Sequence, residues 1–203
     1  MGALTPLVKV ARDGRTWVSA VSLYTLTGLG VALAVGAGIG ELGRVAGLAG
    51  RPTPALAVCL AVALVLAARE LGVLRFRLPE RPLQTEQVWL HLFGPLGAAT
   101  LWGLHLSLGF FTRVNYGGFW LLTLLALGLG SPGLGALLLG GHWLGKALSV
   151  WVAPLALRTS PDGSEVVLTW DPDGRHYRRV QAVGLLAAWI VLAAWLTALV
   201  VGG

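Results

Sequence analysis

Three side chains that can carry a proton or bind a metal lie inside apolar stretches of the sequence, namely His105, His142 and Lys146. A neutral imidazole can bind haem or another metal, relay a proton or make a structural hydrogen bond. An ammonium group surrounded by apolar residues is costly, so it indicates a polar path or cavity. His142 and Lys146 are four residues apart and therefore share one face of a helix.

Other polar residues lie close to the ends of these apolar stretches. Arg113 and Asn115 follow the stretch that contains His105, and Glu41 follows the first apolar stretch of the chain. Glu41 is three residues before Arg44, so it is either half of a surface ion pair or a proton-handling carboxylate below the interface. We expect a cavity or transport path to be lined by His105, Arg113, Asn115, His142, Lys146 and Glu41.

Composition shows what kind of element must position these side chains. The 203 residues are 56% hydrophobic and 12% charged, against about 25% charged residues in a soluble domain. The mean hydropathy is +0.76. Since a transmembrane helix needs about 20 apolar residues, the length allows roughly five to seven spans. These values exclude an ordinary soluble domain.

The order of apolar and polar segments predicts an all-α, polytopic membrane bundle of about six transmembrane helices, in one integral membrane domain over 1–203. Turn-forming Ser-Pro-Asp-Gly and Asp-Pro-Asp-Gly sequences flank β-prone residues in the last polar segment, which predicts a short extramembrane β-hairpin or flap. Ser131 and Pro132 form a helix start, and Pro95 predicts a kink. The predicted spans are 17–40, 54–71, 92–112, 114–130, 132–157 and 181–201, with polar connections at 72–87 and 158–180.

Glycines at helical spacing predict where these helices pack closely. The two pairs Gly36 with Gly40 and Gly141 with Gly145 are each four residues apart, so each pair lies on one helix face. Membrane helices approach closely at such small-xxx-small faces. We predict helix packing at both pairs.

In the six-span arrangement the third and fifth helices run in the same direction and can be neighbours. His105 lies about 12 Å from Arg113 along its helix, and His142 lies about 15 Å from Pro132, so both are near mid-membrane. They either line a polar cavity between the third and fifth helices, serve as hydrogen-bonded structural residues, or bind one b-type haem or a quinone. We expect no cofactor; if a haem is bound, a single b-type haem held by His105 and His142 is the most that these residues permit.

Basic residues give the chain a net charge of +6, but they flank the apolar stretches instead of forming a run interleaved with aromatic residues. We therefore expect the lipid bilayer as partner, with another membrane protein or a second copy, and no nucleic acid. The six-span arrangement places seven Lys and Arg residues on each side of the membrane. Basic residues therefore do not decide the orientation of the protein, and we favour the orientation with cytoplasmic termini. The single cysteine, Cys59, excludes an internal disulfide and a thiol relay.

The sequence thus predicts a multi-pass protein of the cell membrane, acting as a small transporter or as an accessory or assembly subunit of a membrane complex. A membrane redox subunit that binds haem or quinone through His105 and His142 is the alternative. We predict no catalytic residue, since no Ser-His-Asp arrangement, His-Glu-x-x-His sequence or pair of intramembrane carboxylates occurs.

Overall fold

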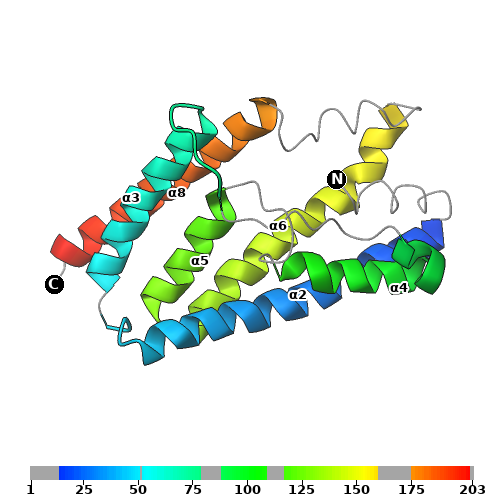
Figure 1. Cartoon of the computed structure of the whole chain (residues 1–203), viewed down its shortest axis with the longest axis horizontal. Coiled ribbons are helices and arrows are strands. Elements are labelled where there is room, and N and C mark those ends of the chain that lie inside the picture. The colour runs from blue at the N-terminus through cyan, green and yellow to red at the C-terminus, as the bar shows by residue number, and fades with distance from the viewer. Residues whose placement is uncertain (1–13, 51, 79–87, 109–116, 160–174, 202–203) are drawn as a thin grey trace. The chain divides into compact units, whose positions relative to one another are not determined.

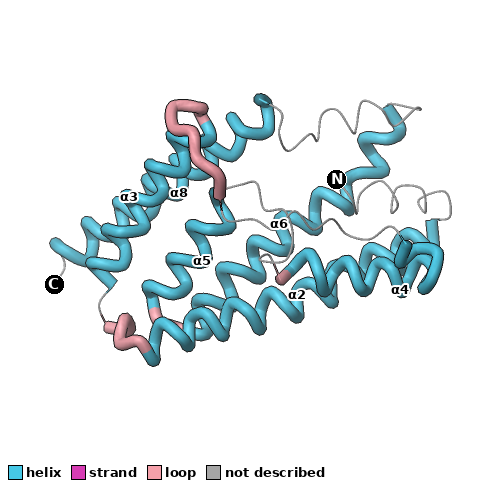
Figure 2. The backbone as a smooth tube through the Cα atoms, viewed as in Figure 1, coloured by secondary structure: helices cyan, strands magenta, loops and turns pink. Residues whose placement is uncertain are grey.

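The computed structural model describes residues 14–50, 52–78, 88–108, 117–159 and 175–201 (Figures 1 and 2). In these ranges the chain is all helical and contains no strand. This confirms the predicted all-α class. The predicted hairpin falls on 160–174, outside the described residues. The helices are α2 (Gly14–Val45), α3 (Pro52–Glu70), α4 (Val88–Ser107), α5 (Gly117–Leu129), α6 (Pro132–Thr159) and α8 (Arg175–Val201).

Local sequence chemistry explains the helix ends. The Ser131 hydroxyl accepts a hydrogen bond from the Leu134 amide at 3.4 Å, and Pro132 is the first helical residue of α6, which confirms the predicted cap. At the end of α2, Gly47 adopts a φ of 73° while the Leu48 amide bonds back to the Gly43 carbonyl at 3.0 Å. Glycine adopts this left-handed conformation without steric cost, so it ends the helix there.

The kink that Pro95 predicts in α4 is also confirmed. Gly94 has φ 66° and ψ −177°, which divides α4 into a short first part and a longer second part. Proline at 95 has no amide hydrogen to continue the first part, and glycine at 94 tolerates the positive φ. The apolar stretch therefore does not form one straight helix.

Among the described residues, three helices are long and apolar enough to cross a membrane: α2, α3 and the Arg178–Val201 part of α8. With 13 residues, α5 is a shorter apolar helix. Together these helices indicate a membrane protein.

The chain forms two compact units, each with its own core. Unit 1 comprises Met1–Ala32, Glu80–Val114 and Gly140–Gly174, and unit 2 comprises Leu33–Pro79, Asn115–Leu139 and Arg175–Gly203. The helices α2 and α6 contribute one part to each unit.

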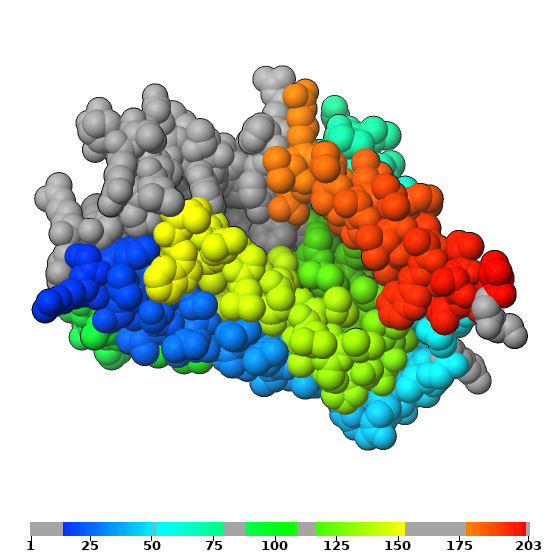
Figure 3. Space-filling model, turned by 180° about the vertical axis from the view of Figure 1, so that it is seen from behind, coloured from blue at the N-terminus to red at the C-terminus, as the bar shows by residue number. Residues whose placement is uncertain are grey.

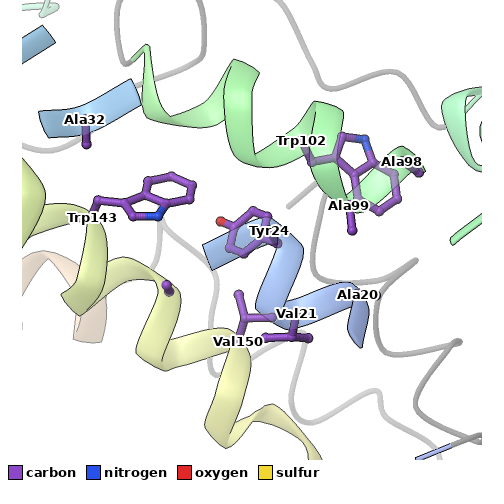
Figure 4. Packing of buried hydrophobic residues seen from close by; sticks show 10 residues of the cluster. Ala20, Val21, Tyr24, Ala32, Ala98, Ala99, Trp102, Trp143 and Val150 are labelled. Atoms are coloured by element: carbon purple, nitrogen blue, oxygen red, sulfur yellow. The ribbon is translucent and has the colours of Figure 1, made fainter. Parts of the chain in front are cut away.

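In unit 1, α4 and α6 both pack against the first half of α2. Tyr24 of α2 lies between Trp102 of α4 and Trp143 of α6 (Figure 4), and its ring centroid is 5.0 Å from that of Trp143. A Cβ at Gly28 would overlap the Trp143 ring, so glycine at this position allows the indole to approach the backbone of α2.

In unit 2, α3 packs against α5 and α8, with a core of leucines that includes Leu56, Leu121 and Leu185. A Cβ at Gly117 would lie 2.9 Å from Leu66, near the end of α3, and one at Gly128 would lie 2.9 Å from Ala55, near its beginning. Therefore α5 runs antiparallel to α3.

A line of glycines joins the second half of α2 to the start of α6. A Cβ at Gly36 would overlap the Gly135 carbonyl, one at Gly40 would overlap the Ser131 carbonyl, and one at Gly43 would overlap the Leu127 carbonyl. We call these contacts the closed glycine seam. They place the end of α2 beside the turn between α5 and α6, so α2 runs antiparallel to α6.

These contacts give the directions of the helices in unit 2. The first residues of α5 and α8 are neighbours, since a Cβ at Gly118 would lie 3.7 Å from Oε1 of Gln181. Consequently α2, α5 and α8 share one direction, and α3 and α6 run the opposite way. Six alternating spans would require α2 and α5 to run in opposite directions, so the predicted six-span order is not confirmed.

Candidate functional site

His105 lies on α4 in unit 1, where its ring meets Trp89 edge-on at a centroid distance of 5.7 Å. Its Nδ1 is buried, and no hydrogen-bond partner for it occurs among the described residues. The same holds for Nε1 of Trp102, one helical turn earlier and fully buried. A buried polar atom without a partner is costly, so each of these two atoms is a polar point inside an apolar unit.

His142 and Lys146 lie on α6, also in unit 1, and both are half-buried. Nζ of Lys146 is 5.6 Å from the centroid of the Trp143 ring. An ammonium group over an indole face is stabilised by about 0.5–2 kcal/mol, which offsets part of the cost of a charge among apolar residues. The aromatic ring thus gives Lys146 a favourable neighbour within its own helix.

Thr25 is a structural position of unit 1 that the sequence analysis missed. Its carbonyl accepts a hydrogen bond from Nε1 of Trp143 at 3.0 Å, and its hydroxyl accepts one from Nε1 of Trp151 at 3.0 Å. Trp151 also packs edge-on against Trp17 at 5.6 Å. These bonds satisfy two indoles and fix α6 on α2 within unit 1. The eight-residue spacing of the two tryptophans was the available signal.

The predicted site residues are only partly brought together. His105, His142 and Lys146 all belong to unit 1, but among the described contacts His105 meets Trp89 and not His142. The shared haem, quinone or cavity site of the two histidines therefore stays a prediction.

The other predicted site residues lie elsewhere. Glu41 belongs to unit 2 and accepts a hydrogen bond from Nε of Arg44 at 2.8 Å. The side chains of Arg44 and Glu41 are 59% and 42% exposed, which fits a surface ion pair. Such a pair contributes little to stability, about 0–1 kcal/mol. Arg113 and Asn115 lie outside the described residues.

The two predicted glycine pairs differ in their surroundings. Gly36 and Gly40 belong to the closed glycine seam, whereas a Cβ at Gly141 or Gly145 would meet no atom within 4 Å. Gly141 and Gly145 are both exposed. Two exposed leucines of the same helix, Leu144 and Leu148, each follow one of these glycines by three residues, and the surface of α6 is visible in Figure 3. We call this surface of unit 1 the open glycine face; it consists of Gly141, Leu144, Gly145 and Leu148.

A buried group of charges in unit 2 was also missed. Glu70, at the end of α3, has a side chain only 2% exposed, and its Oε1 is 2.5 Å from Nη1 of Arg69. Its Oε2 is 3.6 Å from Nε of Arg178, near the start of α8. The adjacent Arg69 and Glu70 at the end of an apolar stretch were the signal, but their partner is more than 100 residues away in the sequence.

No protein-family model, curated protein or solved structure matches the chain.

Proposed function

We propose that the chain is a multi-pass protein of the cell membrane that acts as an accessory or assembly subunit and pairs with a second copy through the open glycine face. The observation that carries this proposal is the contrast between the two glycine pairs. At Gly36 and Gly40 a helix occupies the space beside the glycines, and at Gly141 and Gly145 no described residue does.

The physical reason is specific to lipid. Apolar side chains gain little from leaving lipid for a helix interface, so association depends on close packing and on polar contacts. Glycine allows two backbones to approach and brings many atoms into van der Waals contact. A second copy supplies an identical glycine pair, and a two-fold interface of this kind is self-complementary.

The helix directions support five crossings instead of six. In this arrangement α2, α3, α5, α6 and α8 cross, and the chain between α3 and α5, which includes the kinked α4, begins and ends on one side. The Gly14 end of α2 and the Val201 end of α8 then lie on opposite sides. Reporters fused to the two termini should therefore give opposite signals, whereas a six-span protein would give equal ones.

The charge distribution favours the five-crossing arrangement. Of the 15 Lys and Arg residues, eleven lie on the membrane side of the Gly14 end, and Arg44 and Arg51 lie on the other side. Arg113 and Lys146 are not counted on either side. An excess of basic residues is typical of the cytoplasmic side. The cytoplasmic side then carries Lys9, Arg12, Arg15, Arg69, Arg75, Arg77, Arg81, Arg158, Arg175, Arg178 and Arg179.

Energy transfer between two differently labelled populations of the full chain in vesicles tests the pairing. We expect transfer for the unaltered protein and its loss for the double variant Gly141→Leu with Gly145→Leu, because leucine keeps the backbones apart. Gly184→Leu is the matched control, since Gly184 is exposed on α8 and has equally open surroundings. Transfer that is absent in the unaltered protein, or that persists in the double variant, contradicts the proposal.

The α2 surface needs a separate control, because it also has exposed glycines. Gly30 and Gly38 meet no atom within 4 Å of a Cβ. The double variant Gly30→Leu with Gly38→Leu should retain energy transfer. If it loses transfer while the α6 variant keeps it, the interface lies on α2.

Transport through unit 1 is a second candidate function. It is favoured by the buried Nε1 of Trp102 and Nδ1 of His105, for which no partner occurs among the described residues. A water or a transported solute is the kind of partner that such a buried atom needs. A membrane redox subunit with a haem held by His105 and His142 is a different candidate. A reduced-minus-oxidised absorption spectrum tests it, because such a haem gives a sharp band that His105→Ala or His142→Ala removes.

A further inference from the structure

The end of α3 and the start of α8 form a strongly basic surface in unit 2. Arg69 donates a hydrogen bond from Nε to the Phe76 carbonyl at 3.0 Å, and its guanidinium lies 5.8 Å from the Phe76 ring centroid. Glu70 forms ion pairs with both Arg69 and Arg178. Because a buried carboxylate needs compensating charges, this pairing fixes the two helix ends beside each other.

The segment after α3 adds further arginines to this surface. Arg75 and Arg77 are exposed, as is Arg179 on α8. In Figure 3 the teal atoms that follow α3 adjoin the orange start of α8. No acidic partner occurs for these three side chains among the described residues. We call this region the arginine surface; it consists of Arg69, Arg75, Arg77, Arg178 and Arg179, with Glu70 as its acidic residue.

The same segment also exposes apolar side chains next to its arginines. Val73 is 74% exposed, Leu74 41% and Phe76 42%. The segment is nevertheless held in place, because the Val73 amide bonds to the Ala68 carbonyl at 2.9 Å and Leu78 is buried in the core of unit 2. Alternating apolar and basic residues in a fixed segment match the boundary between acyl chains and head groups.

We propose that the arginine surface binds the phosphate of an anionic phospholipid, whose acyl chains contact Val73, Leu74 and Phe76. Guanidinium groups bind phosphate oxygens in bidentate fashion, and basic pockets between membrane helices bind anionic head groups. The pairing of Arg69 and Arg178 with Glu70 positions two guanidinium groups, and the exposed arginines supply the excess positive charge. This inference does not depend on the pairing of two copies through α6.

The test uses the full chain in detergent, titrated with phosphatidylglycerol or phosphatidylcholine, with bound lipid counted by native mass spectrometry. We expect phosphatidylglycerol to bind more tightly than phosphatidylcholine. The double variant Arg75→Gln with Arg77→Gln should weaken phosphatidylglycerol binding about 30-fold, since each basic residue near a lipid surface contributes about fivefold. Arg44→Gln is the matched control, an exposed arginine at the end of α2, and should leave binding unchanged.

Two further measurements distinguish a lipid from free phosphate. Excess inorganic phosphate should not displace phosphatidylglycerol, because it lacks acyl chains, and Val73→Ser should weaken lipid binding. Complete displacement by phosphate, with no effect of Val73→Ser, assigns the surface to free phosphate and overturns the proposal. Equal phosphatidylglycerol binding by the double arginine variant and the unaltered chain also overturns it.

Discussion

Two glycine pairs with the same four-residue spacing have opposite surroundings in this protein. Gly36 and Gly40 lie in the closed glycine seam, where carbonyl groups of 131 and 135 occupy the space that a side chain would need. Gly141 and Gly145 lie on the open glycine face and meet no atom within 4 Å of a Cβ. Small residues at helical spacing therefore show that close approach is possible, and only the surroundings show whether it occurs within the chain.

The seam gives the largest expected effect. Gly36→Ala should destabilise the folded chain by about 3 kcal/mol, because the added methyl group overlaps the Gly135 carbonyl and a backbone group cannot move aside without separating α2 from α6. Unfolding of the purified protein in a denaturing detergent measures this loss. Gly38→Ala, at an exposed position of the same helix, is the control. Equal stability of both variants would mean that the seam contributes nothing.

An intermediate effect is expected where a side chain, and not a backbone group, occupies the space. Gly28→Ala places a methyl group in the Trp143 ring, which can turn but then loses its hydrogen bond to the Thr25 carbonyl. We expect a loss of about 2 kcal/mol, from strain and the unpaired indole together. Near-ultraviolet circular dichroism should also change, since the tryptophan environment changes. An unaltered spectrum with full stability would contradict this contact.

The smallest change in stability is expected at the open glycine face, where substitution by alanine should stabilise the folded chain. Gly141→Ala meets no atom and raises helix propensity, so it should stabilise the separate chain by about 0.5–1 kcal/mol. The same unfolding assay, at a protein concentration too low for pairing, measures the gain. A destabilisation as large as that of Gly36→Ala would show that both pairs pack within one chain and would remove the distinction between them.

Sequence reasoning predicted the features that depend on a few neighbouring residues. The Ser131 cap, the kink at Gly94 and Pro95, and the all-α class follow from local hydrogen-bonding chemistry and composition. It did not predict the Glu70 to Arg178 pair, because the two residues are on different helices and no local pattern joins them. It also did not predict that α2 and α5 run in the same direction, because the direction of a helix depends on contacts with distant residues.

The sequence by itself determined that the chain is helical and apolar enough for a membrane, and that α6 begins at Pro132. These properties depend on residues that are consecutive in the sequence, so they can be predicted without knowledge of the fold. The tertiary structure decided that α5 runs with α2, that one glycine pair is closed and the other open, and that Glu70 joins Arg69 and Arg178. Direction and contact depend on which helices become neighbours, and that choice depends on the packing of residues far apart in the chain.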